Sequence, residues 1–171
     1  MKRAIIIGCP GGGKSTFARA LHEVTAPPLI HLDQLNWNAD RTVVPREIFH
    51  QRLDNALMGE RWIIDGNYGS TMEKRIAACD TVFFLDYPVE VCLAGVRDRR
   101  GKPRTDMPWV ETDDEAEDEV FLEFIRNYER ESRPTVMELL EKYPEKRVIR
   151  FGGRDEAELY LQNIVSGRND D

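Results

Sequence analysis

The sequence GCPGGGKS at residues 8–15 decides the fold of this chain. It matches the pattern G-x-x-x-x-G-K-S/T, follows the apolar run Lys2–Ile7 and precedes a helical pattern over Lys14–Thr25. Glycines in such a turn let successive backbone N–H groups point toward one anion, because no Cβ stands in the way. The N-terminus of the following helix adds the positive end of its dipole. The segment is therefore predicted to be a phosphate-binding loop (P-loop).

The side chains of this loop have specific expected roles. Lys14 is placed to reach the β- and γ-phosphates of ATP, and the Ser15 hydroxyl is the expected protein ligand of Mg²⁺. Thr16 is expected to hydrogen-bond the α-phosphate. The residues predicted to bind the nucleotide here are Gly8, Pro10, Gly11, Gly12, Gly13, Lys14, Ser15 and Thr16. The motif thus predicts ATP and Mg²⁺ as cofactors.

Short runs of β-branched and aromatic residues alternate with helical patterns along the chain. The expected strands are Lys2–Ile7, Pro28–Leu32, Arg61–Asp65, Thr81–Asp86 and Arg147–Phe151. The expected helices are Lys14–Thr25, Pro45–Met58, Ser70–Cys79, Val89–Arg100, Glu115–Tyr143 and Asp155–Ser166. The alternation predicts a parallel sheet, and the almost entirely apolar runs predict helices on both faces. The expected fold is α/β, a three-layer α/β/α sandwich with a five-stranded parallel sheet, in one domain over residues 1–171.

The composition limits the class of protein. The chain has 171 residues, of which 41% are hydrophobic and 32% charged, so it is too apolar for a disordered protein. It contains no run of 18 apolar residues that could span a bilayer. The net charge of −7 opposes direct binding of nucleic acid. Cys9, Cys79 and Cys92 lack the spacing of a zinc site, and no targeting segment is recognisable, so a cytoplasmic location is expected.

Two acids stand at the ends of predicted strands. Ligands of open α/β sheets bind beyond the carboxyl ends of the strands, so Asp65 is expected to face Mg²⁺ directly or through water. The alternative is that Asp65 caps the turn that follows. Asp33 is expected to face the same crevice and to orient or deprotonate an acceptor hydroxyl, or to hold a water bound to Mg²⁺. Its alternative role is to cap the start of a helix.

Two aromatic residues flank Asp33. Trp37 could stack on a flat substrate, although a buried aromatic residue is the commoner outcome. His31 lies within an apolar run and is expected to pack in the core rather than to act as a catalyst.

Cationic residues follow the fourth predicted strand. Residues 99–109 read RRGKPRTDMPW, and their Gly and Pro residues predict a basic loop rather than a continued helix. Residues 100–115 are the expected lid. Arg99, Arg100 and Arg104 are the predicted catalytic cations, because P-loop enzymes use arginine to offset charge on the transferred phosphoryl group. The acidic run at 111–119 is expected to oppose the positive end of the helix dipole that follows.

Three further arginines lie within the long predicted helix. Arg126, Arg130 and Arg133 are spaced at i, i+4 and i+7 and would share one helical face. This face is expected to turn toward the nucleotide, with Arg130 binding it.

Several segments resemble the bacterial DNA topology modulation proteins, relatives of adenylate kinase. They are GCPGGGKS at 8–15, HLDQLNW at 31–37, IIDGNYGS at 63–70, FLDYP at 84–88 and SRP at 132–134. The resemblance implies a nucleoside-monophosphate-kinase-like fold with ATP at the P-loop. It also implies an acceptor pocket after the second strand and a lid between the fourth strand and the long helix.

The chain departs from adenylate kinases at three places. In the lid, residues 111–114 read ETDD in place of Arg-x-Asp-Asp, which removes a cation. Those enzymes carry Asp-Gly-Phe-Pro-Arg where residues 65–69 read DGNYG, so the arginine that would bind an acceptor phosphate is missing. On the helix after residues 84–86, Gly95 takes the place of the arginine near adenine. Arg99 is the only arginine of that pair that the resemblance carries over.

Together these features predict an ATP- and Mg²⁺-dependent phosphotransferase. Its acceptor would be a small molecule such as a nucleoside, a nucleotide or a hydroxyl metabolite. The alternatives are a nucleotide-dependent regulatory module and an NTPase that needs no acceptor. The sequence leaves the acceptor and the oligomeric state open.

Overall fold

The computed structural model describes residues 1–99, 102, 106–108 and 119–167. The predicted catalytic cations Arg100 and Arg104 lie outside these residues. So does most of the predicted lid, of which Lys102 and residues 106–108 are described, and most of the acidic run at 111–119, of which only Glu119 is described.

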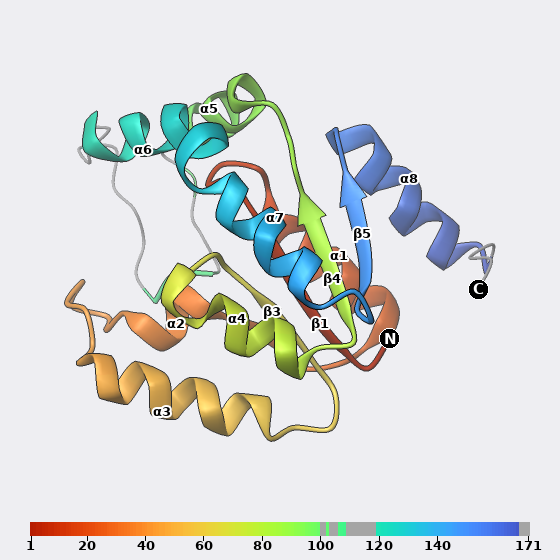
Figure 1. Ribbon diagram of the computed structural model, residues 1–171, viewed down its shortest axis with the longest axis horizontal. Helices are drawn as coiled ribbons and strands as arrows, with labels where there is room; N and C mark the ends of the chain where they lie inside the picture. The colour runs from red at the N-terminus through yellow and green to blue at the C-terminus, as the bar shows by residue number, and fades with distance from the viewer. Residues whose placement is uncertain (100–101, 103–105, 109–118, 168–171) are drawn as a thin grey trace.

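The five predicted strands form one parallel sheet. The strands are β1 (Arg3–Gly8), β2 (Leu29–His31), β3 (Trp62–Asp65), β4 (Thr81–Leu85) and β5 (Arg147–Phe151). Their order is β2-β3-β1-β4-β5, and every neighbouring pair is parallel. Because β1 occupies the centre, the loop that follows it leaves the middle of the carboxyl edge (Figure 1). The predicted α/β fold with a five-stranded parallel sheet is confirmed.

Helices cover both faces of this sheet. One face packs against α1 (Lys14–Thr25), α5 (Val89–Asp98), α6 (Glu119–Glu131) and α8 (Arg154–Val165). The other packs against α3 (Arg46–Leu57), α4 (Gly69–Ala78) and α7 (Arg133–Lys142). Successive strand residues enter opposite cores: Ile6 belongs to the first, and Ile5 and Ile7 belong to the second. This is the predicted three-layer arrangement, and it explains why the central strands are apolar at every position.

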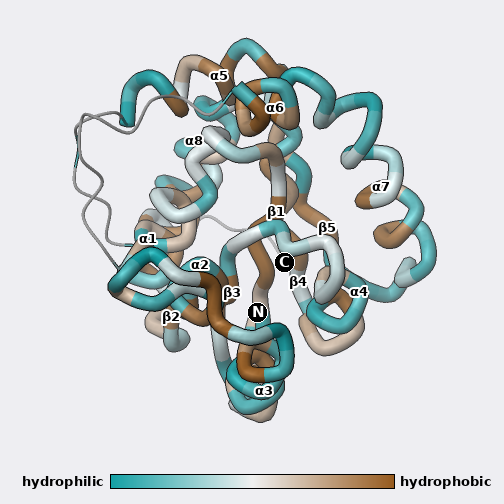
Figure 2. The backbone as a smooth tube through the Cα atoms, turned by 90° about the vertical axis from the view of Figure 1, so that its left-hand side faces the viewer, coloured by the Kyte–Doolittle hydropathy of each residue, from teal (hydrophilic) through white to brown (hydrophobic). Residues whose placement is uncertain are grey.

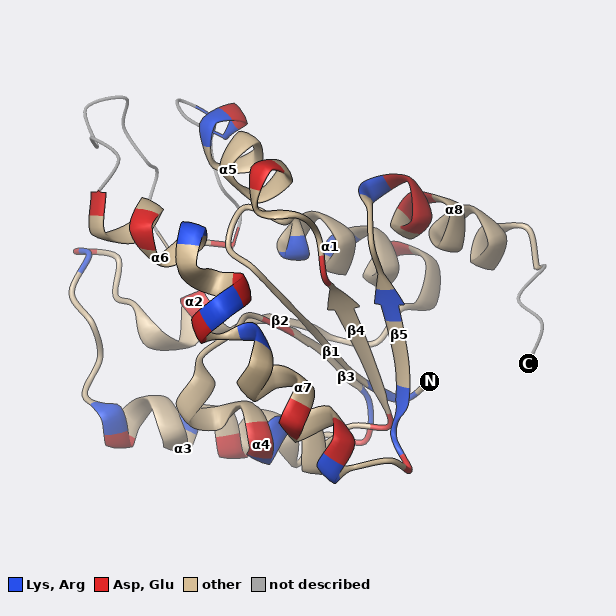
Figure 3. Ribbon diagram, turned by 45° about the horizontal axis from the view of Figure 1, so that its top comes forward, with Lys and Arg blue, Asp and Glu red and all other residues tan. Residues whose placement is uncertain are grey.

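The distribution of polarity follows the layers. Figure 2 shows hydrophobic colours concentrated on the central strands and hydrophilic colours on the outer sides of the helices. Charged residues lie on the helices and near the strand ends, while the middle of β1 and of β4 carries none (Figure 3). The edge strand β5 differs, because Arg147 and Arg150 are exposed on it.

The prediction of one long helix over Glu115–Tyr143 is wrong. The structure has two helices there, α6 and α7, which meet at Ser132. Pro134 lies in the first turn of α7, where its missing N–H costs nothing, whereas inside a continuous helix it would remove a hydrogen bond and clash with the preceding turn. Arg133 therefore starts a new helix and does not share a face with Arg126 and Arg130.

One short helix was not predicted. The second predicted strand ends at His31, and α2 (Leu32–Asn36) follows at once, with Asp33 in its first turn. Five residues are too few to show a helical period, so the apolar run was read as strand through Leu32.

Two further observations concern the composition. Cys9, Cys79 and Cys92 are buried, and each is a free thiol. Among the helices that the structure describes, none has the length and apolar character needed to cross a bilayer.

Candidate functional site

A cavity of about 1100 Å³ opens at the carboxyl edge of the sheet. Its walls come from the P-loop and α1, from Asp33, from the loop after β3, and from side chains of α5, α6 and α8. Lys102, Asp106 and Met107 also line it. Small-molecule sites usually occupy about 300–1,000 Å³, so this cavity has room for a nucleotide and a small second molecule.

The predicted P-loop forms one wall of the cavity. Pro10, Gly11, Gly12, Gly13, Lys14, Ser15 and Thr16 line it. The Lys14 ammonium donates hydrogen bonds to the carbonyl oxygens of Gly8 (3.0 Å) and Cys9 (3.1 Å), so its side chain folds back over the loop. Burial lowers the pKa of Lys14, and the nearby charges of Asp65 and Asp33 oppose that shift. The loop therefore holds the Lys14 cation beside its own backbone carbonyls, on the wall of the cavity.

Helix α5 approaches the P-loop closely because two glycines meet there. A Cβ on Gly95 would lie 2.0 Å from the carbonyl oxygen of Gly11, and a Cβ on Gly11 would lie 2.0 Å from the carbonyl oxygen of Cys92. Gly11 also has a φ of 81°, which favours glycine. Gly95 thus serves as a close backbone contact between α5 and the loop.

Ser15 and Asp65, both expected to face Mg²⁺, are in direct contact. The Ser15 hydroxyl oxygen lies 2.6 Å from Oδ2 of Asp65 and 2.9 Å from Oδ2 of Asp106. His31 Nδ1 lies 2.5 Å from the other oxygen of Asp65, and these two residues face each other in the β2–β3 register. His31 is buried, as expected, but it also holds the carboxylate at the end of the neighbouring strand.

The donor set at Ser15 suits a hard divalent cation. Mg²⁺ prefers oxygen ligands and usually keeps several waters while bridging phosphates. Ser15 supplies a hydroxyl and Asp65 a carboxylate with its orientation fixed by His31. These residues fit the Mg²⁺ that P-loop proteins use with ATP, and they would hold it beside the P-loop.

Asp33 lines the same cavity as this cluster. Its Oδ1 accepts a hydrogen bond of 2.6 Å from the hydroxyl of Tyr68. Burial raises the pKa of Tyr68, as does the nearby charge of Asp33, so the hydroxyl stays protonated and remains a donor at neutral pH. Tyr68 itself has a φ of 34°, which is rare for a residue with a side chain. Its backbone is therefore held in an unusual conformation that places the ring beside Asp33.

Arg75 holds that backbone. It is fully buried on α4 and donates hydrogen bonds to the carbonyl oxygens of Gly66 (2.9 Å), Asn67 and Tyr68 (3.3 Å). Burial lowers the pKa of Arg75 to about 10, which leaves the guanidinium charged at neutral pH. Asn67 continues the connection, because its side-chain oxygen accepts the N–H of Gly8 at 3.0 Å. The loop after β3 is thus tied both to α4 and to the start of the P-loop.

The predicted cations divide into two groups. Arg99 lines the cavity and lies 5.6 Å from the ring centroid of Phe121, and Lys102 lines the cavity as well. Arg130 does not line the cavity: it bonds Asn127 and Glu131, each at 2.9 Å, and its side chain is 75% exposed. The structure therefore does not bring Arg130 to the nucleotide side of the molecule.

Arg126 and Arg133 also have protein partners. Arg126 pairs with Glu119 and Glu123 on its own helix. Arg133 makes a two-pronged contact with Asp86 at the end of β4, at 2.8 and 2.9 Å, and Arg150 reaches the same carboxylate. The three arginines therefore do not form the expected common face. Arg126 pairs within α6, and Arg133 joins α7 to Asp86 after β4.

Sequence reasoning missed several residues of the site. The sequence patterns give no functional role to Tyr68, Asn67, Arg75 or Asp106. Trp37, a candidate for stacking on a flat substrate, is half-buried and lies outside the cavity lining. Arg75 had a signal: it lies four residues after Thr71 and three after Met72, on the buried face of α4. Tyr68 and Asp106 lie in loops, where no periodicity reveals which residues turn inward.

The sheet order, the loop after β1 and the cavity beside it define the fold of a P-loop kinase. Solved structures with this fold include shikimate kinase from Acinetobacter baumannii in complex with shikimate, with 17% identity, a TM-score of 0.60 and coverage of 99% of this chain and 96% of that one. Shikimate kinase from Bacteroides thetaiotaomicron is similar at 18% identity, with a TM-score of 0.58 and coverage of 96% and 97%. No protein-family model matches this sequence, and no curated protein sequence matches it significantly.

Proposed function

We propose that this protein is an ATP- and Mg²⁺-dependent phosphotransferase that acts on a hydroxyl group of a small molecule. The observation that carries the proposal is the opening of Lys14, Ser15 and Asp33 onto one cavity. Phosphoryl transfer asks a protein mainly to position two reactants and to offset charge. A phosphate-binding loop and a carboxylate that line one cavity meet the first requirement.

Each residue has a defined task in this proposal. The P-loop amides and Lys14 bind the β- and γ-phosphates, and Ser15 and Asp65 hold Mg²⁺, which offsets phosphate charge when bound. Asp33 accepts the proton of the acceptor hydroxyl as its oxygen forms a bond to the γ-phosphorus. The bond from that phosphorus to the bridging oxygen breaks, and ADP leaves. Arg99, on the cavity wall, is placed to offset charge on the phosphoryl oxygens.

The geometry favours a hydroxyl acceptor over a phosphate acceptor. Asp33 brings a negative charge to the acceptor side, and its neighbour there is the Tyr68 hydroxyl. An acceptor phosphate would be repelled by this carboxylate. Arg75, which contacts this loop, is fully buried and bonded to its backbone carbonyls. A carboxylate and a phenol suit a neutral polyol or sugar-like hydroxyl better.

An acceptor panel tests this proposal. ADP release is measured with ATP and Mg²⁺ alone, then with nucleosides, nucleotides, sugars and hydroxy acids, including shikimate, and products are identified by mass spectrometry. We expect one hydroxyl compound to raise ADP release and to gain the mass of one phosphoryl group.

Two results would contradict the proposal in different ways. ADP release that is the same with every acceptor, with inorganic phosphate as the product, would identify an NTPase. Absence of both ADP release and thermal stabilisation by ATP would exclude nucleotide chemistry at this cavity.

A further inference from the structure

Asn67 connects the P-loop to the loop that carries Tyr68. It lines the cavity, and its Oδ1 accepts a hydrogen bond of 3.0 Å from the N–H of Gly8. The carbonyl oxygen of the same Gly8 accepts a bond of 3.0 Å from the Lys14 ammonium. The next residue, Tyr68, bonds Asp33 through its hydroxyl. Asn67 is therefore linked to Lys14 through Gly8 and to Asp33 through Tyr68, although neither the motif nor the resemblance gives it a role.

The bond to Gly8 fixes the orientation of the Asn67 amide. A backbone N–H only donates, so the atom of Asn67 that meets it is the oxygen, and the NH₂ group points away from Gly8. Among the residues that the structure describes, only the Trp62 indole nitrogen and the Tyr128 hydroxyl are buried side-chain polar atoms without a hydrogen-bond partner. Nδ2 of Asn67 is neither of these, and no described residue accepts its protons, so it is exposed where Asn67 lines the cavity.

The backbone around Asn67 is held in an unusual conformation. The residues on both sides have positive φ values, 127° at Gly66 and 34° at Tyr68. The buried Arg75 donates to the carbonyl oxygens of Gly66, Asn67 and Tyr68. Strained backbone gathers at functional sites, because the surrounding structure has to hold it. This turn fixes the position of the Asn67 amide without a ligand.

A fixed amide donor beside the P-loop suits an oxygen of a phosphoryl group. During transfer the γ-phosphoryl group spreads charge over its oxygens, and donors that already point at them stabilise that charge. Asp33 and Asp65 line the same cavity, and an ionised carboxylate only accepts hydrogen bonds. Asn67 brings a donor to this cavity, and its connection to Lys14 through Gly8 places it next to the predicted phosphate-binding cation.

We propose that Asn67 is a catalytic residue whose Nδ2 donates a hydrogen bond to an oxygen of the γ-phosphoryl group. The inference rests on the proposed function, because that function brings the γ-phosphoryl group to Lys14 and Asp33. No proton leaves the amide, which offsets charge while the phosphoryl group passes to the acceptor. The contact of Oδ1 with Gly8 sets the direction of the donor.

Nucleotide binding tests the proposal without an acceptor. Calorimetry in Mg²⁺ compares ADP with AMP-PNP, a non-hydrolysable ATP analogue that carries a γ-phosphate, on wild type, Asn67→Asp and Asn67→Leu. Asn67→Asp keeps an oxygen for the Gly8 N–H and loses the donor, whereas Asn67→Leu loses both without adding charge. Asn55→Asp is the control, because Asn55 is exposed on α3 and outside the cavity lining.

The γ-phosphate is expected to decide the result. Both Asn67 variants should bind ADP within twofold of wild type and AMP-PNP about tenfold or more weakly, while Asn55→Asp matches wild type for both. ADP release with the acceptor that the panel identifies should fall about 10²-fold in both Asn67 variants. Equal weakening of ADP and AMP-PNP, or wild-type affinity for both, would overturn the proposal. An effect in Asn67→Asp that is missing from Asn67→Leu would be charge repulsion and would overturn it as well.

Two further measurements separate this proposal from loss of folding and from the proposed function. The thermal unfolding midpoint of each variant is determined first, and all titrations are run below the lowest transition. A purely structural Asn67 would give Asn67→Asp wild-type affinity and turnover, since the Gly8 contact persists in that variant. Failure of wild type to bind ADP would refute the proposed function and this inference with it. Wild type that binds ADP, with AMP-PNP binding unchanged in the variants, overturns this inference alone.

Discussion

The two sides of the cavity are built in different ways. The phosphate side is one continuous stretch, residues 8–16, and consists mostly of backbone and glycine. The proposed acceptor side combines Asp33 from α2, Tyr68 from the loop after β3 and Arg75 from α4. Phosphate is the same in every nucleotide, so a local backbone cradle suffices for it. The proposed acceptor recognition depends on side chains that only the folded chain assembles.

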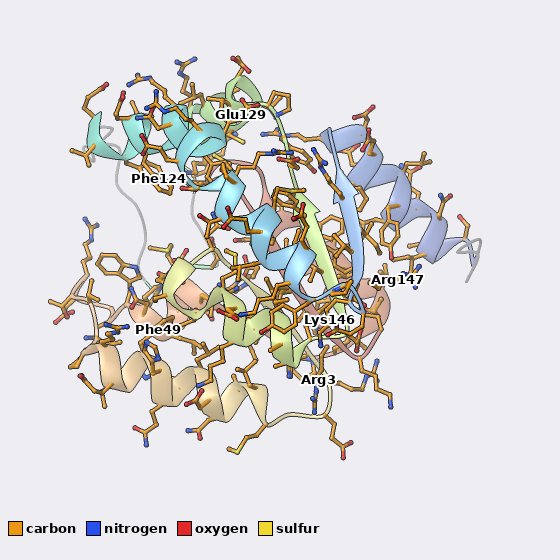
Figure 4. All side chains as sticks on the ribbon, in the orientation of Figure 1. Arg3, Phe49, Phe124, Glu129, Lys146 and Arg147 are labelled. Carbon is orange, nitrogen blue, oxygen red and sulfur yellow. The ribbon has the colours of Figure 1, made fainter. Side chains whose placement is uncertain are left out.

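The two ends of the sheet also differ in the residues that they carry. Figure 4 shows Arg3, Lys146 and Arg147 at the end of the sheet where the strands begin, and Phe124 on α6 near the opposite end. Phe124 lines the cavity, whereas the three basic residues do not. The cavity therefore opens at the carboxyl edge, and four substitutions there test how far the two proposed sides of the site are independent.

Lys14→Ala is expected to have the largest effect. It removes the cation of the phosphate side, so turnover should fall on the order of 10³-fold and ATP should no longer raise the unfolding temperature. ADP release measures turnover, and the thermal shift with ATP and Mg²⁺ measures the stabilisation by ATP. Lys74→Ala is the matched control, because Lys74 pairs with Asp54 at the surface. Retained turnover and stabilisation in Lys14→Ala would contradict the role of the loop.

Asp33→Asn is expected to separate the two sides. Loss of a general base costs about 10²–10⁴-fold in turnover, while stabilisation by ATP should persist because the P-loop is intact. The same two assays are used, with Asp40→Asn as control, since Asp40 is exposed and bonded to Thr42. If Asp33→Asn lost stabilisation by ATP as well as turnover, the two sides of the cavity would not be independent.

Arg75→Met is expected to weaken the acceptor side through its support. The change leaves the carbonyls of Gly66, Asn67 and Tyr68 without this donor, at a cost of about 1–3 kcal/mol in the free energy of unfolding. Urea unfolding measures the loss. Arg52→Met is the control, because Arg52 is exposed and donates to the single carbonyl of Leu35, so a change within about 0.5 kcal/mol is expected. Similar values for both variants would refute the supporting role.

Tyr68→Phe is expected to have the smallest effect. The change removes the hydroxyl bonded to Asp33 and keeps the ring. Loss of this hydrogen bond should cost about 1 kcal/mol, which lowers kcat/KM for the acceptor roughly fivefold. Kinetics with varied acceptor and with varied ATP locate the change. Tyr143→Phe loses a hydroxyl bonded to Glu73, outside the cavity lining, and should behave as wild type. A change confined to the KM for ATP would contradict the placement of Tyr68 on the acceptor side.

Much of the fold could be predicted because local patterns carry it. A short apolar run predicts each strand. The central strands are apolar at successive positions because helices cover both of their faces, and this pattern identifies them as buried. The long helix failed at Pro134, whose effect depends on whether it lies inside a helix or at its start. The roles proposed for Lys14, Ser15, Asp33 and Asp65 came from the sequence, and the structure lines one cavity with all four.

The sequence alone determined the P-loop motif, the parallel sheet and the edge of the sheet at which the cavity opens, because all three follow from short-range patterns. Only the tertiary structure decided that Arg75 supports the acceptor loop, that Arg130 turns to solvent, and that Asp106 meets Ser15. The physical reason is the length scale of each cause. Backbone geometry and hydrophobic period act over a few residues, whereas hydrogen bonds between distant residues depend on how the layers pack.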